Sequence, residues 1–165
     1  MKLTKLDKTL KKLQEQLVPK IDSALSKEVL QAVSDAEGKT IYDEVYSMPT
    51  SGRYTRRWDN GGLLDPDNVQ GSVANGTLAV VNVTKPNPYL NGINRYGGLS
   101  TTPSSASLAG IVEHGTYDPH GAGYDYWKDA EARPFTAKTV EDLKKSGAHI
   151  AALKKGLQRQ GIKVK

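Results

Sequence analysis

The clearest pattern at the start of the chain is a row of leucines every three or four residues, with lysine and glutamine between them: Leu3, Leu6, Leu10, Leu13 and Leu17. This spacing predicts an amphipathic helix with one narrow apolar stripe. Such a stripe needs a partner, which is either the core of the same subunit or a neighbouring subunit in a coiled coil. We expect Pro19 to end or kink this helix, because proline has no amide hydrogen and its ring clashes with the preceding turn.

A second helical segment is predicted after Pro19, because apolar residues gather on one side at Ile21, Leu25, Val29 and Val33. It is expected to run to about Glu37 and to stop at Gly38, since glycine readily takes the left-handed conformation that follows many helix ends. Residues 1–37 are therefore predicted to form a helical N-terminal part.

Further along the chain, the helical spacing of apolar residues gives way to an alternation of apolar and polar residues. Residues 69–84 alternate β-branched and small polar residues around Asn75-Gly76, a dipeptide that favours positive φ in a tight turn. This predicts a β-hairpin of residues 69–74 and 77–84. Residues 108–113 are predicted as a third strand, and the three strands would form a small antiparallel sheet with one face that needs helix cover.

A long loop and a C-terminal helix complete the prediction. Residues 86–108 are rich in glycine, serine, threonine and proline, which predicts a flexible, exposed loop that becomes ordered only against a neighbouring subunit or ring. Residues 136–161 have helical apolar spacing interrupted at Gly147 and Gly156, and Thr136 or Thr139 can cap their first amides. The predicted fold class is α+β in one domain, residues 1–165: N-terminal helices, a small antiparallel β-sheet with a long loop, and a C-terminal helix packed across the sheet.

The amino-acid composition limits the kinds of protein that this chain can be. The 165 residues are 37% hydrophobic, a size and polarity that fit one modest core. The chain has no cysteine, which excludes disulfides, thiol nucleophiles and thiolate metal sites. No apolar run approaches the roughly 18 residues of a membrane helix, and the lysine-rich N-terminus lacks an apolar signal core, so we expect no membrane contact and synthesis in the cytoplasm.

The most unusual segment is residues 53–68, Arg-Tyr-Thr-Arg-Arg-Trp-Asp-Asn-Gly-Gly-Leu-Leu-Asp-Pro-Asp-Asn. It places three arginines and two aromatic residues before a double glycine and an acidic turn. Further motifs surround it in order along the chain: Tyr-Asp-x-x-Tyr-x-x-Pro at 42–49, Ile-Val-Glu-His-Gly at 111–115, Tyr-Trp at 126–127 and Ala-Arg-Pro-Phe at 132–135. Together they resemble the tail-completion, or head-to-tail joining, neck proteins of long-tailed double-stranded DNA bacteriophages, in the form found in phages of Gram-positive hosts.

This resemblance implies a virion structural protein at the neck or tail, made in the host cytoplasm, without catalytic activity and without a cofactor. It implies a homo-oligomeric ring of six or twelve copies. The implied partners are the phage connector or stopper and the tail terminator or tail tube proteins. Closing such a ring requires two unlike patches on each subunit. The middle of the chain, residues 37–135, has eleven acidic and eight basic side chains, and this acidic part and the basic end of the chain provide them.

The residues expected at an interface are arginines and aromatics, because guanidinium is planar, weakly hydrated and suited to ion pairs between subunits. They are Arg53, Tyr54, Arg56, Arg57, Trp58, Tyr89, Arg95 and Tyr96. Two alternatives stay open for the cluster at 53–58. The same groups could approach duplex DNA in a channel, or Trp58 and Tyr54 could fill the core while the arginines cap it.

The net charge is +5, and in residues 136–165 basic side chains outnumber acidic ones eight to two. Basic groups in this region could contact packaged double-stranded DNA without sequence preference, or an acidic partner. They are Lys144, Lys145, Lys154, Lys155, Arg159 and Lys163. A solvated helix face is the alternative, and lysines near the helix end also fit the helix dipole.

Candidate chemistry is sparse. His114 and His120 flank a glycine-rich turn with Glu113, Asp118 and Asp125 nearby, but their spacing matches no established zinc pattern. Residues 65–68 are interpreted as an acidic turn before a strand and not as a calcium loop. No serine lies in a nucleophile-elbow context. We therefore predict no catalytic, cofactor-binding or metal-binding residue, with a metal-dependent enzyme as the least favoured alternative.

Overall fold

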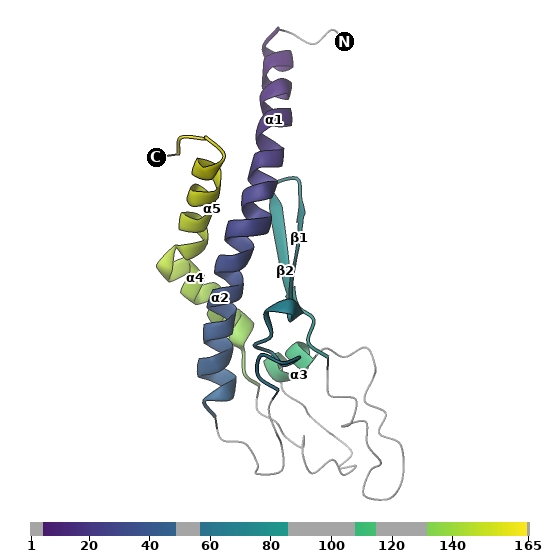
Figure 1. Ribbon diagram of the computed structural model, residues 1–165, viewed down its shortest axis with the longest axis vertical. Coiled ribbons are helices and arrows are strands. Elements are labelled where there is room, and N and C mark those ends of the chain that lie inside the picture. The colour runs from purple at the N-terminus through teal and green to yellow at the C-terminus, as the bar shows by residue number, and fades with distance from the viewer. Residues whose placement is uncertain (1–4, 49–56, 86–107, 115–131, 165) are drawn as a thin grey trace, which may run out of the picture. The chain divides into compact units, whose positions relative to one another are not determined.

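A computed structural model describes residues 5–48, 57–85, 108–114 and 132–164 (Figure 1). The described residues are mainly helical, with a small two-stranded antiparallel sheet, so the predicted α+β class is confirmed. They form two compact units. The first draws its residues from Met1–Asp35, Gly71–Val80 and Asp142–Lys165, and the second from Ala36–Gln70 and Val81–Glu141.

The N-terminal helices are longer than predicted. Helix α1 spans Lys5–Ala24 with Pro19 inside it, and it continues through a π-helical turn, η1 (Leu25–Val29), into α2 (Leu30–Ile41) and a second π-helical turn, η2 (Tyr42–Tyr46). The expected end of the helix at Pro19 is wrong. The proline ring is exposed, and the next turns bury Leu25 and Val29, which offsets the roughly 3 kcal/mol that proline costs in a helix.

The expected stop at Gly38 is wrong for a similar reason. Glycine inside a helix costs only about 1 kcal/mol relative to alanine, while the residues that follow in α2 and η2 bury Ile41, Val45 and Tyr46 in a core. Packing of this face therefore outweighs the local preference of glycine.

The hairpin prediction is confirmed. Strand β1 spans Val69–Ala74 and β2 spans Thr77–Asn82, so β2 ends two residues before the expected boundary. Asn75 and Gly76 have φ of 51° and 76°, the positive values that a two-residue hairpin turn requires.

The third strand is wrong, because the segment forms helix α3, Leu108–His114. Leu108, Ala109 and Val112 are spaced for one helix face, and they join the core of the second unit. A short run of mainly apolar residues fits a strand and a short buried helix equally well, and the core contacts decide between them.

The C-terminal segment forms two helices, α4 (Phe135–Ser146) and α5 (Ala148–Arg159). Gly147 separates them at φ 65°, so one of the two expected interruptions is a true break. Gly156 instead lies within α5, where an added Cβ would come 2.7 Å from the Cβ of Ala24. The helices are therefore in close contact at a point where only glycine fits.

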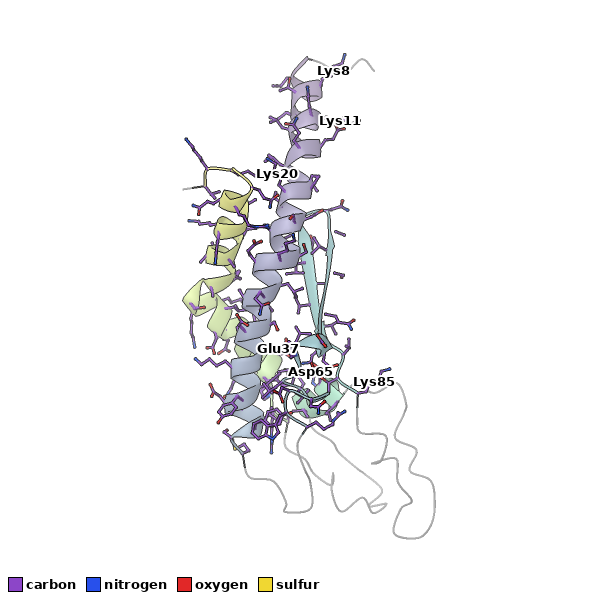
Figure 2. All side chains as sticks on the ribbon, in the orientation of Figure 1. Lys8, Lys11, Lys20, Glu37, Asp65 and Lys85 are labelled. Carbon is purple, nitrogen blue, oxygen red and sulfur yellow. The ribbon has the colours of Figure 1, made fainter. Side chains whose placement is uncertain are left out.

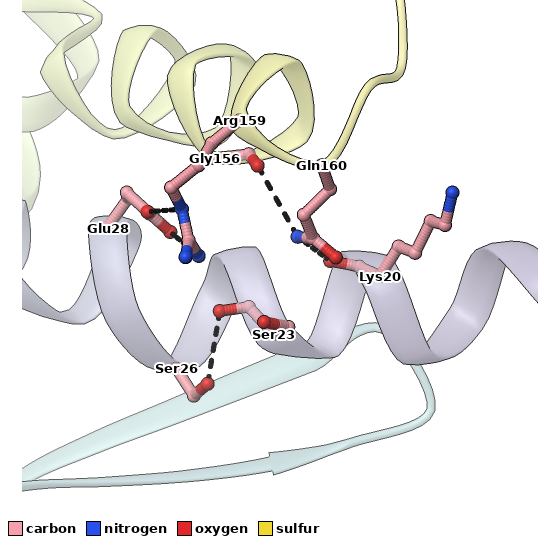
Figure 3. Close-up of polar contacts among 7 residues, drawn as sticks. All are labelled: Lys20, Ser23, Ser26, Glu28, Gly156, Arg159 and Gln160. Atoms are coloured by element: carbon pink, nitrogen blue, oxygen red, sulfur yellow. Dashed lines mark hydrogen bonds and ion pairs between the residues drawn. The ribbon is translucent and has the colours of Figure 1, made fainter.

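In the first unit, α1 lies between α5 and the hairpin (Figure 1). The C-terminal helix was expected to lie across the sheet, and its main contacts are instead with α1 and η1. Arg159 Nε pairs with Glu28 Oε1 at 2.6 Å, and Gln160 Nε2 donates to the carbonyl of Lys20 at 2.8 Å (Figure 3). On the hairpin side, the amide of Gly76 donates to Asp22 Oδ1 at 2.7 Å.

The second unit has one apolar core, to which α2, η2, α3, α4 and the segment before η3 (Pro66–Asn68) contribute: Ile41, Val45, Tyr46, Leu63, Leu108, Ala109 and Phe135. The start of α4 is capped by a carboxylate from α3. Glu113 accepts from the amides of Thr136 and Ala137 at 2.8 and 3.4 Å. The expected threonine cap is therefore wrong, since Thr139 Oγ1 donates to the carbonyl of Phe135 inside the helix.

Within the described ranges, no helix combines the length and apolar character that crossing a bilayer requires.

Candidate interaction site

Residues 57–68 of the second unit form a tightly hydrogen-bonded loop. Trp58 has φ of 51°, a left-handed conformation that is uncommon for a bulky residue. The Trp58 carbonyl accepts from the amide of Leu64 at 3.2 Å, and the amide of Gly61 donates to Asp65 Oδ2 at 2.6 Å. Asp65 also begins the 3₁₀ turn η3, so the predicted acidic turn before a strand is confirmed.

Gly62 is the buried centre of this loop. Its carbonyl accepts from the amide of Asp65 at 3.2 Å and from Asn68 Nδ2 at 2.9 Å. An added Cβ at Gly62 would lie 2.2 Å from the Trp58 carbonyl oxygen. The second glycine of the pair is therefore required by space, while Gly61, with φ of 72°, is required by backbone conformation.

The loop presents Trp58 to two tyrosines of η2. We call Tyr42, Tyr46 and Trp58 the aromatic platform. The Trp58 ring stacks on Tyr46 with centroids 4.5 Å apart and planes at 20°, and it lies 6.2 Å from the ring of Tyr42. Tyr46 is buried, whereas Trp58 remains 40% exposed and Tyr42 53% exposed. The Tyr46 hydroxyl accepts from the amide of Leu63 at 3.3 Å, and this bond fixes the position of Tyr46 under the indole.

Arg57 precedes the platform and is held by backbone. Its Nη2 donates to the carbonyl of Lys85 at 2.5 Å. Its Nε is buried and has no hydrogen-bond partner among the described residues. A guanidinium group carries five N–H donors and no acceptor, so Arg57 has donors beyond the one that Lys85 occupies.

A buried polar network lies under the loop, built from Glu37, Asn82 and Thr84. Asn82 Nδ2 donates to Glu37 Oε1 at 2.9 Å and to the carbonyl of Leu63 at 3.2 Å, and Asn82 Oδ1 accepts from Thr84 Oγ1 at 2.5 Å. Figure 2 shows Glu37 on α2 beside the loop that contains Asp65. The network ties the helix, the end of β2 and the loop together.

Glu37 is the member of this network whose charged form is disfavoured by burial. Burial raises the pKa of its carboxyl above the ordinary value of 4.5, the hydrogen bond from Asn82 opposes the rise, and the carboxylate of Glu113 adds to it. Folding therefore holds this proton more tightly than the unfolded chain does, so the stability contributed by Glu37 falls as pH rises from the ordinary value through the raised one.

We expect Glu37→Gln to be more stable than the unchanged chain at pH 7, by about 1 kcal/mol, because the amide keeps the oxygen that Asn82 contacts and removes a poorly solvated charge. Urea unfolding at pH 4 and pH 7 measures this, and the advantage of the variant should shrink at pH 4. Asp43→Asn, which changes an exposed carboxyl of the same helical run, is the control. An advantage that is equal at both pH values would contradict the assignment.

A family comparison matches residues 9–159, almost the whole chain, to the YomN model. The chain belongs to the YomN family. This family is phage-derived, so the bacteriophage origin implied by the resemblance is confirmed, and the match does not extend to tail completion. No curated protein and no solved structure matches this YomN family member.

Of the interface residues predicted for this YomN family member, Arg57 and Trp58 lie at the platform. The other six lie outside the described residues: Arg53, Tyr54, Arg56, Tyr89, Arg95 and Tyr96. The core alternative for Trp58 is met in part, because one face of the indole covers Tyr46 while 40% of the residue stays exposed. Tyr42 and Tyr46 were not predicted as site residues, although their spacing of four residues is a signal that they share a helix face.

The predicted basic residues lie on or after the C-terminal helices, and all are exposed: Lys144, Lys145, Lys154, Lys155, Arg159 and Lys163. Arg159 forms the ion pair with Glu28 described above. Among the histidines, His114 ends α3 and His149 lies in α5, while His120 falls outside the described residues. The described part of the YomN chain contains no group of three or more His, Asp or Glu side chains placed to hold a metal ion.

Proposed function

We propose that this YomN family member is a virion structural protein at the phage neck, where copies form a ring that completes the tail or connects head to tail. The observation that carries the proposal is the aromatic platform. Trp58 and Tyr42 remain exposed at a site that a loop and a buried network hold rigid, and Trp58 belongs to the segment on which the resemblance rests. Rigid, exposed aromatic side chains are typical anchors of protein interfaces.

The proposed mechanism is binding without turnover. A ring of six or twelve copies closes through two unlike patches on each subunit, and the platform provides one of them. Arg57 precedes Trp58 in the chain, and its planar guanidinium group suits an ion pair with a partner's carboxylate. The neighbours of the ring are the connector or stopper on one side and the tail terminator or tail tube on the other.

Loss of the gene product tests the proposal. We expect particles assembled without it to accumulate as filled heads without tails beside separate tails, and electron microscopy of purified particles counts both. Restoring the unchanged gene in trans should restore joined particles and place the protein in them. Normal tailed particles without the product would contradict the neck role.

A second candidate is contact with packaged DNA, favoured by the exposed lysines of α4 and α5. It predicts duplex binding that weakens steeply with salt and that is lost on charge reversal at Lys154 and Lys155. Under the neck proposal, the same charge reversal leaves the joining of heads to tails largely intact.

A further inference from the structure

The N-terminal half of α1 carries an apolar stripe that the described residues leave open. Leu6, Leu10, Leu13 and Leu17 are 68, 51, 47 and 41% exposed. Figure 1 shows this half of α1 extending past both the hairpin turn and the end of α5, so neither neighbour in the first unit covers it. Four leucines on one side of one helix form a larger apolar surface than isolated exposed residues do.

The same face of α1 is already a helix contact further along. Ala24, seven residues after Leu17, packs against Gly156 of α5, and Lys20 accepts a hydrogen bond from Gln160 (Figure 3). Because α5 runs antiparallel to α1, it ends at this point, and Gly161, at φ of 79°, turns the chain away from a helical path. The stripe is therefore the continuation of a helix-packing face beyond the point where the intrachain helix stops.

The spacing of the stripe indicates what kind of helix covers it. The leucines follow one another at steps of four, three and four, which is the heptad spacing of a coiled coil. Gln14 and Gln16, beside the stripe, are uncharged, so two copies can approach without repulsion. Asp7 is the charged residue beside the stripe at its N-terminal end, and Figure 2 shows Lys8 and Lys11 extending outward from α1.

We infer that this stripe packs against the same stripe of a second copy of the chain, with the two α1 helices parallel. The inference rests on the proposed function for its direction. In a ring with an even number of copies, opposite subunits are related by a half-turn about the axis, which keeps their α1 helices parallel and lets like stripes meet. This contact is additional to the two unlike patches that close the ring. The contact runs from Leu6 to Leu17, roughly 16 Å of helix. A contact this short is weak by itself. Closure of a ring holds the copies together and so raises the effective concentration of one stripe for the stripe that it contacts.

Cysteine cross-linking tests the inference directly, because the chain has no cysteine of its own. In a parallel pair, the two copies of residue 13 face each other, so full-length Leu13→Cys should form a covalent dimer under mild oxidation. Lys8→Cys, on the outer face of the same helix, is the matched control. We expect linking at least tenfold faster at residue 13, and equal rates at the two positions would overturn the pairing.

A second variant tests whether the stripe contributes to self-association, independently of how the two helices are arranged. Leu10→Gln/Leu13→Gln keeps good helix formers and removes the apolar seam, so self-association measured by sedimentation over a concentration series should weaken roughly tenfold or more. Unchanged association would overturn the inference. If residue 13 does not cross-link and particles lacking the protein are still tailless, the pairing fails and the neck role stands. If residue 13 does cross-link and such particles keep their tails, the pairing stands and the neck role fails.

Discussion

Gly62→Ala is expected to destabilise the second unit severely, by about 3 kcal/mol or more. The new Cβ would lie 2.2 Å from the Trp58 carbonyl oxygen and 2.8 Å from the Trp58 amide nitrogen, distances far inside van der Waals contact. The obstacle is backbone, which cannot rotate away as a side chain can. Relief requires the loop to open, and opening breaks the two hydrogen bonds that the Gly62 carbonyl accepts.

The neighbouring glycine provides the control. Gly61→Ala places its Cβ 3.6 Å from Arg57 Nη1, an ordinary contact, and is penalised only for its φ of 72°, by about 1 kcal/mol. Guanidinium unfolding of the two variants compares a steric penalty with a conformational one at adjacent positions. Equal losses for Gly61→Ala and Gly62→Ala would show that the loop does not hold Gly62 in the position described.

The features predicted correctly from sequence depend on neighbouring residues. The hairpin follows from Asn75-Gly76, because positive φ at two adjacent positions is a property of the dipeptide itself. The break between α4 and α5 at Gly147 is equally local. Neither depends on what the rest of the chain does.

The errors arise where distant packing overrides a local preference. Pro19 and Gly38 do not end their helices because buried residues further along favour continuation. Residues 108–113 form a helix because three of their apolar side chains join a core shared with η2 and α4. No local pattern contains these contacts.

The candidate site was only partly predictable for the same reason. Arg57 and Trp58 stand out by residue type, whereas the network that holds their loop joins Glu37 to Asn82, residues that are 45 positions apart in the chain. A glutamate in a helix and an asparagine at a strand end are ordinary in isolation. Only folding brings them together and makes them a buried pair.

If the proposed ring forms, Trp58→Ala is expected to weaken the affinity between neighbouring copies by about 2 kcal/mol or more, which is a factor of roughly 30. The effect on folding should be smaller, about 1 kcal/mol, because the indole is half-exposed and loses mainly its stack on Tyr46. Sedimentation measures assembly, and urea unfolding measures stability. The two readouts distinguish an interface anchor from a core residue.

Two further variants distinguish the effect of the indole side chain from the effect of the backbone conformation at residue 58. Trp58→Gly removes the same indole but relieves the left-handed strain at φ of 51°, so it should recover part of the lost stability and none of the lost assembly. Val81→Ala truncates an exposed apolar side chain elsewhere in the second unit and should change neither by more than about 0.5 kcal/mol. If Trp58→Gly recovers assembly as well as stability, the indole acts only by holding the loop in place. The platform would then not be the contact surface.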